Sequence, residues 1–291
     1  MRNLLSIALC LPLAACIIGE ENGSGGGGGD DTGDGGGGGG GGGSVNDGSL
    51  TGVIAADTTW TGTVLIGIDR QTTTRIDAGV TITVAPGTII KFKEGLGAGL
   101  DIRGTLKFQG TSASKVQLGP NVDGNTYSLI VGSTGKLDLT YAVMTRGSIQ
   151  TNPGSTTTIT DTLMSRAGGD LLIMNGGSVT MLHSQIGVPP GQTDTTHCNI
   201  HTSGDANTIN ITKSNINASP YGLMLYGGQN AIFRNNNWYD NEIDIHTQPG
   251  VSGDVTGSWF DGTAPVAGNG ATLTGTNALS ATKIADAGVR P

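Results

Sequence analysis

A repeat of 22 residues in the last third of the chain decides the fold. It begins with Asn207-Thr-Ile-Asn-Ile-Thr-Lys-Ser-Asn-Ile216, and Gln229-Asn-Ala-Ile-Phe-Arg-Asn-Asn-Asn-Trp238 follows 22 residues later. Val255-Thr-Gly-Ser-Trp-Phe260 continues the pattern after another 22 residues. Short β-type segments at a fixed period, with Gly and Asn between them, are typical of a parallel β-solenoid, in which each repeat forms one turn of the coil, or rung.

The repeat places residues of the same kind in shared columns. Two columns are apolar and predict the core, so Trp238 should stack between the residues one rung before and one rung after it. A third column is made of Asn, and we expect a ladder inside a turn, where the amides satisfy neighbouring backbone groups. The three columns are Ile211, Phe233 and Val255; Ile216, Trp238 and Phe260; and Asn215 and Asn237.

The same pattern extends towards the N-terminus with looser spacing. The aligned apolar positions are separated by 20, 22, 30 and 22 residues, and they are Leu139, Ile159, Met181, Ile211 and Phe233. The long step contains a turn-rich insertion at residues 188–196. About nine rungs fit between Asp57 and Thr263, which predicts a rod of roughly 45 Å at about 4.8 Å per rung.

The start of the body carries a more specific signal. Short alternating runs at 80–84, 89–92, 100–102, 106–108 and 116–118 predict strands. Gly79-Val-Thr-Ile-Thr-Val-Ala-Pro-Gly-Thr-Ile-Ile-Lys-Phe92 and Leu100-Asp-Ile-Arg-Gly-Thr-Leu-Lys-Phe-Gln-Gly-Thr111 resemble the opening rungs of right-handed parallel β-helix proteins of bacterial surfaces, the pectin-lyase-like solenoids. The predicted fold is therefore an all-β, right-handed parallel β-helix over residues 49–263. Residues 264–291 should contain one last strand at 271–273 and then a cap or a loose tail.

The first 16 residues predict where the protein is localised. Met1-Arg2 is followed by an apolar run at residues 4–13 that is too short to span a bilayer, which indicates a cleaved signal at residues 1–15. Leu13-Ala-Ala-Cys16 resembles the lipobox of bacterial lipoproteins, a family in which the Cys becomes the first mature residue and carries the lipid. Ile17 and Ile18 follow Cys16, so no Asp stands at the next position. By the same resemblance, this favours sorting of the lipoprotein to the outer membrane. Which face of that membrane the body occupies stays open.

Residues 16–48 contain almost no apolar side chains and two long Gly runs, 25–29 and 35–43. Such a segment cannot bury enough apolar surface to offset the conformational entropy lost on folding, so we expect it to be disordered. A Gly-rich coil of this length has a mean reach of roughly 30–35 Å. The sequence therefore predicts a tether between a lipid on Cys16 and the folded body.

Composition restricts the partners. The net charge is −8 and only 13% of the residues are charged, which argues against a nucleic-acid partner and against anionic membrane surfaces. The chain has three Cys; Cys10 leaves with the signal and Cys16 carries the lipid. Cys198 is then alone, and no disulfide can form within one chain.

The best candidate for a binding site is the stretch Asp240-Asn-Glu-Ile-Asp-Ile-His246. Strand alternation with Ile243 and Ile245 facing inward turns the polar residues between them outward on one face. The predicted outer row is Glu242, Asp244 and His246, extended by Asp240.

Aligning Ile243 and Ile245 with Leu223 and Leu225 of the previous rung places Tyr226 beside His246. An acidic row beside a Tyr offers oxygen ligands for Ca²⁺ or for a sugar. The alternative is that a half-buried strand simply turns its polar side to water. No other cofactor is indicated by the sequence.

His197-Cys-Asn-Ile-His201 contains Cys and His, which are zinc ligands, but it supplies at most three of them. The two His need not share a face, and the insertion before them favours a surface loop. We assign no metal site here.

Two functional hypotheses remain. The first is a non-catalytic surface protein that presents a long face to a polysaccharide or to another surface protein, as an adhesin or envelope component. The second is a carbohydrate-active enzyme, a polysaccharide lyase or glycoside hydrolase, using the carboxylates near residues 240–246. Against the second, Arg234 is the only Arg or Lys between residues 221 and 262. Residues 49–291 also contain none of the Asp-Asp, Gly-His-Gly and Arg-Ile-Lys signatures of polygalacturonase-like hydrolases. No catalytic residue is assigned.

The lipobox generates one prediction. The Cys16→Ser variant should not be lipidated and should lose stable membrane attachment, because acylation is the only anchor that the sequence offers. Membrane fractionation after a high-salt wash, with wild type as the control, measures this. Retention of the variant with the outer membrane would show that the lipobox interpretation is wrong.

Overall fold

A computed structural model describes residues 49–69, 72–93, 98–189, 191–204, 207–268 and 270–291. These residues belong to one compact unit and contain strands, turns and bends but no helix. None of them forms a helix long and apolar enough to cross a bilayer. The predictions for the signal, for Cys16 and for the Gly-rich tether lie outside the described residues.

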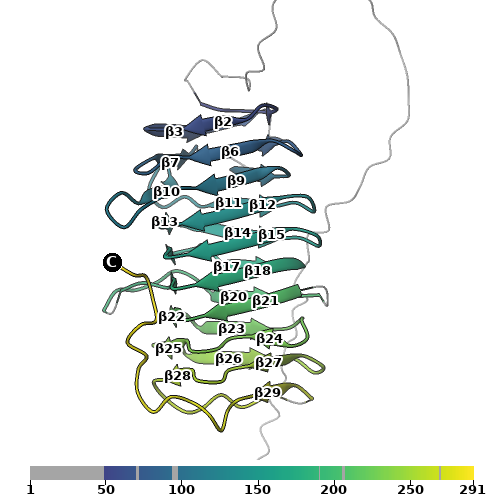
Figure 1. The fold of residues 1–291 in the computed structure, drawn as a ribbon, viewed down its shortest axis with the longest axis vertical. Helices are drawn as coiled ribbons and strands as arrows, with labels where there is room; N and C mark the ends of the chain where they lie inside the picture. The colour runs from purple at the N-terminus through teal and green to yellow at the C-terminus, as the bar shows by residue number, and fades with distance from the viewer. Residues whose placement is uncertain (1–48, 70–71, 94–97, 190, 205–206, 269) are drawn as a thin grey trace, which may run out of the picture. The chain divides into compact units, whose positions relative to one another are not determined.

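The fold is a right-handed parallel β-helix of about nine rungs, as predicted from the repeat. Each complete rung contributes one strand to each of three parallel sheets, and the rungs stack on one another (Figure 1). We label the sheets A, B and C, with their strands given below, and in every complete rung the chain passes from sheet C to sheet A to sheet B.

Sheet A contains β3 (Thr63–Ile66), β7 (Ile89–Phe92), β10 (Val116–Pro120), β13 (Ala142–Thr145), β16 (Leu163–Ser165), β19 (Gln185–Ile186), β22 (Asn215–Asn217), β25 (Asn237–Tyr239) and β28 (Trp259–Phe260). Sheet B contains β1 (Val53–Ile54), β5 (Thr72–Ile76), β8 (Gly99–Ile102), β11 (Tyr127–Val131), β14 (Gly147–Thr151), β17 (Asp170–Met174), β20 (Cys198–Thr202), β23 (Tyr221–Leu225) and β26 (Ile243–Thr247), and β4 (Ile68–Asp69) pairs antiparallel with β5. Sheet C contains β2 (Thr58–Trp60), β6 (Thr81–Val84), β9 (Thr105–Phe108), β12 (Lys136–Thr140), β15 (Thr156–Thr160), β18 (Gly177–Leu182), β21 (Asn207–Thr212), β24 (Ala231–Ile232), β27 (Ser252–Asp254) and β29 (Thr272–Thr274).

The predicted columns match the registers between rungs. Ile216 pairs with Trp238, which pairs with Phe260, and the rings of Trp238 and Phe260 stack at 5.8 Å with an interplanar angle of 5°. The long step is also confirmed, because Met181 pairs with Ile211 across the insertion. Inward side chains on all three sheets form one continuous hydrophobic core.

At the corner between sheets C and A, one residue in each of five successive rungs has a left-handed backbone conformation. The residues at this corner all have φ between 47° and 56°, and they are Tyr141, Asp161, His183, Lys213 and Asn235. The amide that follows each of these residues donates to a side-chain oxygen one rung further on, at 2.9–3.3 Å. The resulting buried ladder consists of Ala142, Thr162, Ser184, Ser214, Asn236 and Ser258.

The predicted Asn ladder is present, but it lies in strands β22 and β25 and not in a turn. Asn237 Nδ2 donates to Asn215 Oδ1 at 2.9 Å and to the carbonyl of Ile284 at 3.0 Å. Asn237 Oδ1 accepts from the Ile284 amide at 2.8 Å. The ladder therefore also holds the C-terminal segment.

The C-terminal segment lies along the outside of this corner. After β29 the chain turns back, and its end lies part-way along the stack (Figure 1). Lys283 Nζ sits 3.6 Å from the centre of the Tyr239 ring, and Lys213 Nζ bonds Asp286 at 2.8 Å.

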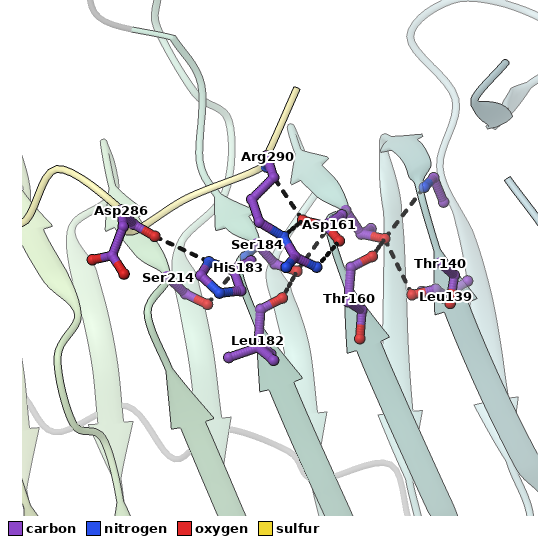
Figure 2. A network of polar contacts seen from close by, with 12 residues as sticks. Leu139, Thr140, Thr160, Asp161, Leu182, His183, Ser184, Ser214, Asp286 and Arg290 are labelled. Atoms are coloured by element: carbon purple, nitrogen blue, oxygen red, sulfur yellow. Dashed lines mark hydrogen bonds and ion pairs between the residues drawn. The ribbon is translucent and has the colours of Figure 1, made fainter. Parts of the chain in front are cut away.

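At the end of the segment, Arg290 forms two side-chain hydrogen bonds with Asp161, at 2.8 and 2.6 Å (Figure 2). The Asp161 side chain is 1% exposed. Burial alone would raise the pKa of Asp161, but the hydrogen bonds and the charge of Arg290 lower it overall. One rung further on, His183 Nδ1 lies 3.0 Å from the Asp286 carbonyl oxygen (Figure 2). These contacts fasten the tail across successive rungs.

Trp238 tests the stacking register. Trp238→Ala should lower the free energy of unfolding by about 3–5 kcal/mol, because it opens a cavity at a fully buried position shared by neighbouring rungs. Trp238→Phe is the matched control and should cost clearly less, since it keeps an aromatic ring and removes an indole N–H that has no hydrogen-bond partner. Thermal and denaturant unfolding measure both. Equal stability of wild type and Trp238→Ala would contradict the register.

Candidate functional site

Six polar and aromatic side chains gather on the outer side of sheet B, in its last four rungs. They come from β17, from β20 and the residue before it, from β23 and the residue after it, and from β26. We call this group the histidine–tyrosine surface: Asp170, His197, His201, Tyr221, Tyr226 and His246.

Asp170 holds two of the three imidazoles. Its Oδ1 lies 2.9 Å from His197 Nδ1, and its Oδ2 lies 2.6 Å from His201 Nδ1. Burial alone would raise the pKa of Asp170, but the hydrogen bonds and charges of the two His lower it. An ionised carboxylate only accepts hydrogen bonds, so the Nδ1 atoms of His197 and His201 both donate to Asp170.

The rings form a chain of edge-on and tilted contacts across the rungs. His201 contacts Tyr226 at 5.3 Å with an interplanar angle of 85°, and Tyr226 contacts His246 at 5.5 Å. His197 contacts Tyr221 at 5.3 Å, and Tyr221 contacts His246 at 5.8 Å. Burial, and secondarily the neighbouring Tyr221, raise the pKa of Tyr226, so its hydroxyl stays protonated at neutral pH. The surface thus offers ring faces and edges together with hydroxyl and imidazole groups.

The predicted contact between Tyr226 and His246 is confirmed. The Tyr226 hydroxyl lies 2.8 Å from His246 Nδ1. The alignment that led to it was wrong by two residues, because Ile245 pairs with Leu223 and not with Leu225. A slip of two residues keeps every side chain on the same face of a strand, so the inward and outward pattern does not reveal it.

The predicted inward position of Ile243 is wrong. Ile245 is buried, but Ile243 at the start of β26 is 41% exposed. Its register partner Tyr221 is itself partly exposed on the histidine–tyrosine surface, so the inward column begins only at Ile245.

The acidic row is also less uniform than predicted. Glu242 and Asp240 are exposed, and the Asp240 amide donates to Asp261 Oδ2 at 2.7 Å. Asp244 is only partly exposed, and its Oδ1 accepts from Asn241 Nδ2 at 2.9 Å. Burial, with some repulsion from Asp261, raises the pKa of Asp244 to about 6 against the lowering effect of Asn241. The ionised form of Asp244 is therefore disfavoured, and its carboxyl does not point freely into water.

The segment from His197 to His201 is not a surface loop, since β20 occupies residues 198–202. Cys198 is fully buried, and burial beside Asp170 raises the pKa of its thiol to about 12. A protonated, buried thiol is neither a nucleophile nor a ready metal ligand. Among the described residues, no group of three or more His, Cys, Asp or Glu is arranged to hold a metal ion.

Sequence reasoning missed Asp170 and Tyr221 and considered the first two His only as metal ligands. The available signal is the register itself: Asp170, Cys198 and Tyr221 pair in consecutive rungs, followed by Ile243 in the next rung. Asp170 precedes the insertion, so its distance in sequence from the two His hides their contact.

Comparison of the chain with family models, with curated proteins and with solved structures found no match. The resemblance to pectin-lyase-like solenoids and to lipoproteins therefore stays a prediction from sequence.

Asp244 generates a pH-dependent prediction. Its folded-state pKa is raised above the ordinary value near 4, so ionisation costs folding energy above about pH 6, and the cost disappears below about pH 4. Asp244→Asn should therefore stabilise the protein by about 1–2 kcal/mol at pH 7 and leave it unchanged at pH 4.

Glu242→Gln, at a neighbouring exposed position, is the control and should change stability by less than about 0.5 kcal/mol at either pH. Denaturant unfolding at the two pH values measures both variants. A loss of stability in Asp244→Asn at pH 7 would contradict the raised pKa.

Proposed function

We propose that the chain is a lipid-anchored surface protein of a bacterial outer membrane that binds a polysaccharide, without catalysis, on the histidine–tyrosine surface. The lipobox at Cys16 and the Gly-rich segment after it support the anchor and the tether. The observation that carries the binding proposal is the continuous run of contacting rings across consecutive rungs of a rigid sheet.

Two physical features favour a sugar ligand. Binding sites for small polar ligands combine aromatic surface with a few fixed hydrogen-bonding groups, and here Tyr221 and Tyr226 stand beside three imidazoles. The rungs repeat at about 4.8 Å, so a chain molecule lying along the solenoid meets similar groups at each step. Groups fixed on strands keep their positions, and this lowers the entropy cost of binding.

The alternative, a carbohydrate-active enzyme, has one observation in its favour. A carboxyl whose pKa is raised to about 6 suits a general acid near neutral pH, and Asp244 has this property. A glycoside hydrolase needs a second carboxylate at a defined separation. The carboxylate that acts electrostatically on Asp244 is Asp261, whose Oδ2 already accepts the amide of Asp240.

Affinity and turnover measured together separate the two functions. The full-length, unlipidated Cys16→Ser chain, with no change in the histidine–tyrosine surface, should bind at least one member of a panel of neutral and acidic polysaccharides and release no product. Replacing both Tyr221 and Tyr226 by Ala should weaken that binding by about tenfold or more, because two ring surfaces are lost from the site.

Tyr141→Ala is the control, since Tyr141 lies at the corner between sheets C and A, away from the histidine–tyrosine surface. Thermal unfolding checks that every variant folds. Unchanged affinity in the double variant would show that the histidine–tyrosine surface is not the binding site. Product release by the unsubstituted surface that disappears in Asp244→Asn would support the enzyme instead.

A further inference from the structure

A second site lies away from the histidine–tyrosine surface, along the edge of sheet A that leads into sheet B. A pocket of about 470 Å³ opens there, lined by Lys91, Gly119, Asp123, Thr145, Arg146 and Arg166. We call it the corner pocket. Its three cationic residues come from three different rungs: one lies in β7, and the other two directly follow β13 and β16.

The register explains why these groups meet. Lys91 pairs with Gly119, and Thr145 pairs with Ser165, in adjacent strands of sheet A. Gly119 has no side chain, and a Cβ there would lie 3.3 Å from Thr145 Oγ1 and 3.9 Å from Lys91 Nζ. The ammonium and the hydroxyl therefore converge over the open backbone of Gly119, which forms the floor of the pocket.

The two Arg occupy equivalent corners one rung apart, with φ of 61° for Arg146 and 60° for Arg166. Arg146 Nε bonds Asp123 Oδ1 at 3.1 Å, but the Asp123 side chain is 94% exposed, so this ion pair is weak and replaceable. Arg166 donates to Gln192 Oε1, a neutral acceptor, at 2.5 Å. Among the described residues, no carboxylate forms an ion pair with the side chain of Lys91 or Arg166, although Asp194 Oδ1 accepts the backbone amide of Arg166.

Three cations and one exposed carboxylate line the pocket. A second carboxylate lies just behind the lining, because Asp194 Oδ1 accepts the Arg166 backbone amide at 2.8 Å, so the local balance is about one positive charge. Three cationic donors from three rungs suit a tetrahedral anion with three acceptor oxygens better than the planar two-oxygen carboxylate of a uronate. A phosphate monoester carries about −1.5 to −2 at pH 7 and offers three acceptor oxygens, which Arg binds through two parallel N–H bonds.

We propose that the corner pocket binds the dianionic phosphate group of a phosphate monoester. The inference depends on the pocket alone, and the proposed polysaccharide binding can fail without affecting it. Three sources share this chemistry: free phosphate, a sugar phosphate and a phosphorylated lipid headgroup.

The first test is a titration of the full-length, unlipidated Cys16→Ser chain with inorganic phosphate, with a hexose phosphate and with vesicles containing phosphatidic acid. Saturable binding to at least one probe is expected, and it should weaken below about pH 6, where phosphate monoesters lose their second charge. The probe that binds most tightly identifies the source. Absence of saturable binding to all three probes up to about 10 mM phosphate would overturn the proposal.

Matched variants separate a formed pocket from diffuse attraction. Replacing Lys91, Arg146 and Arg166 together by Gln should weaken binding by about a hundredfold or more, because three charge-assisted hydrogen-bond donors are lost. The control replaces Lys107, Lys115 and Lys136 by Gln, which removes the same charge from outside the pocket. Equal losses in the two triple variants would contradict a specific site.

One single variant should raise phosphate affinity, a change that misfolding cannot produce. Asp123→Asn removes the exposed carboxylate that competes for Arg146, so phosphate affinity should rise by about two- to fivefold. A lower affinity in Asp123→Asn would overturn the assigned charge balance.

Discussion

The left-handed corner between sheets C and A is the constraint on which the rest of the structure depends. A left-handed residue turns the next amide out of the strand and towards the following rung, where it needs an acceptor inside the protein. Thr, Ser or Asn at the next position of the following rung supplies that acceptor, and the ladder passes from Ala142 to Ser258 without interruption. It continues even through the long step at the insertion, since the Ser184 amide still reaches Ser214 Oγ at 3.2 Å.

This constraint decides where the chain can vary. The loop between β10 and β11 and the insertion between β19 and β20 both lie on the passage from sheet A to sheet B, opposite the buried ladder. The first supplies Asp123 to the corner pocket, and the second ends at His197 of the histidine–tyrosine surface. A repeated hydrogen-bond pattern on one corner thus leaves the other passage free to carry binding groups, as loops on rigid scaffolds do. The C-terminal segment adds to the fixed side, because Arg290 neutralises a carboxylate at the ladder that would otherwise be buried and unpaired.

The architecture could be predicted from sequence because apolar columns repeat at a fixed period, and Ile216, Trp238 and Phe260 made that period visible. The corner ladder was present only implicitly: Ser214, Asn236 and Ser258 follow the same period, but Ser and Asn are common in turns and do not stand out.

The site was poorly predictable for a different reason. Alternation decides which face a side chain occupies but not which residue lies beside it, so a slip of two residues in β26 went unnoticed. Asn241 donates a hydrogen bond to Asp244 three residues further on, and no periodic pattern encodes such a contact.

Net charge illustrates how a whole-chain property can hide a local one. Six of the 23 acidic residues and one of the 15 basic residues lie within residues 1–48, so residues 49–291 hold 17 acidic and 14 basic residues. Their balance is −3, and it is unevenly spread: residues 240–261 contain five acidic residues and no basic one, while the corner pocket gathers three cations. Charges separated by more than about 8 Å are largely screened at physiological salt, so an anion near Lys91 and Arg146 responds to its neighbours and hardly to the acidic rungs. A chain of net charge −8 is therefore poorly suited to a polyanion that would lie along its whole length, yet it can hold a single anionic group at one corner.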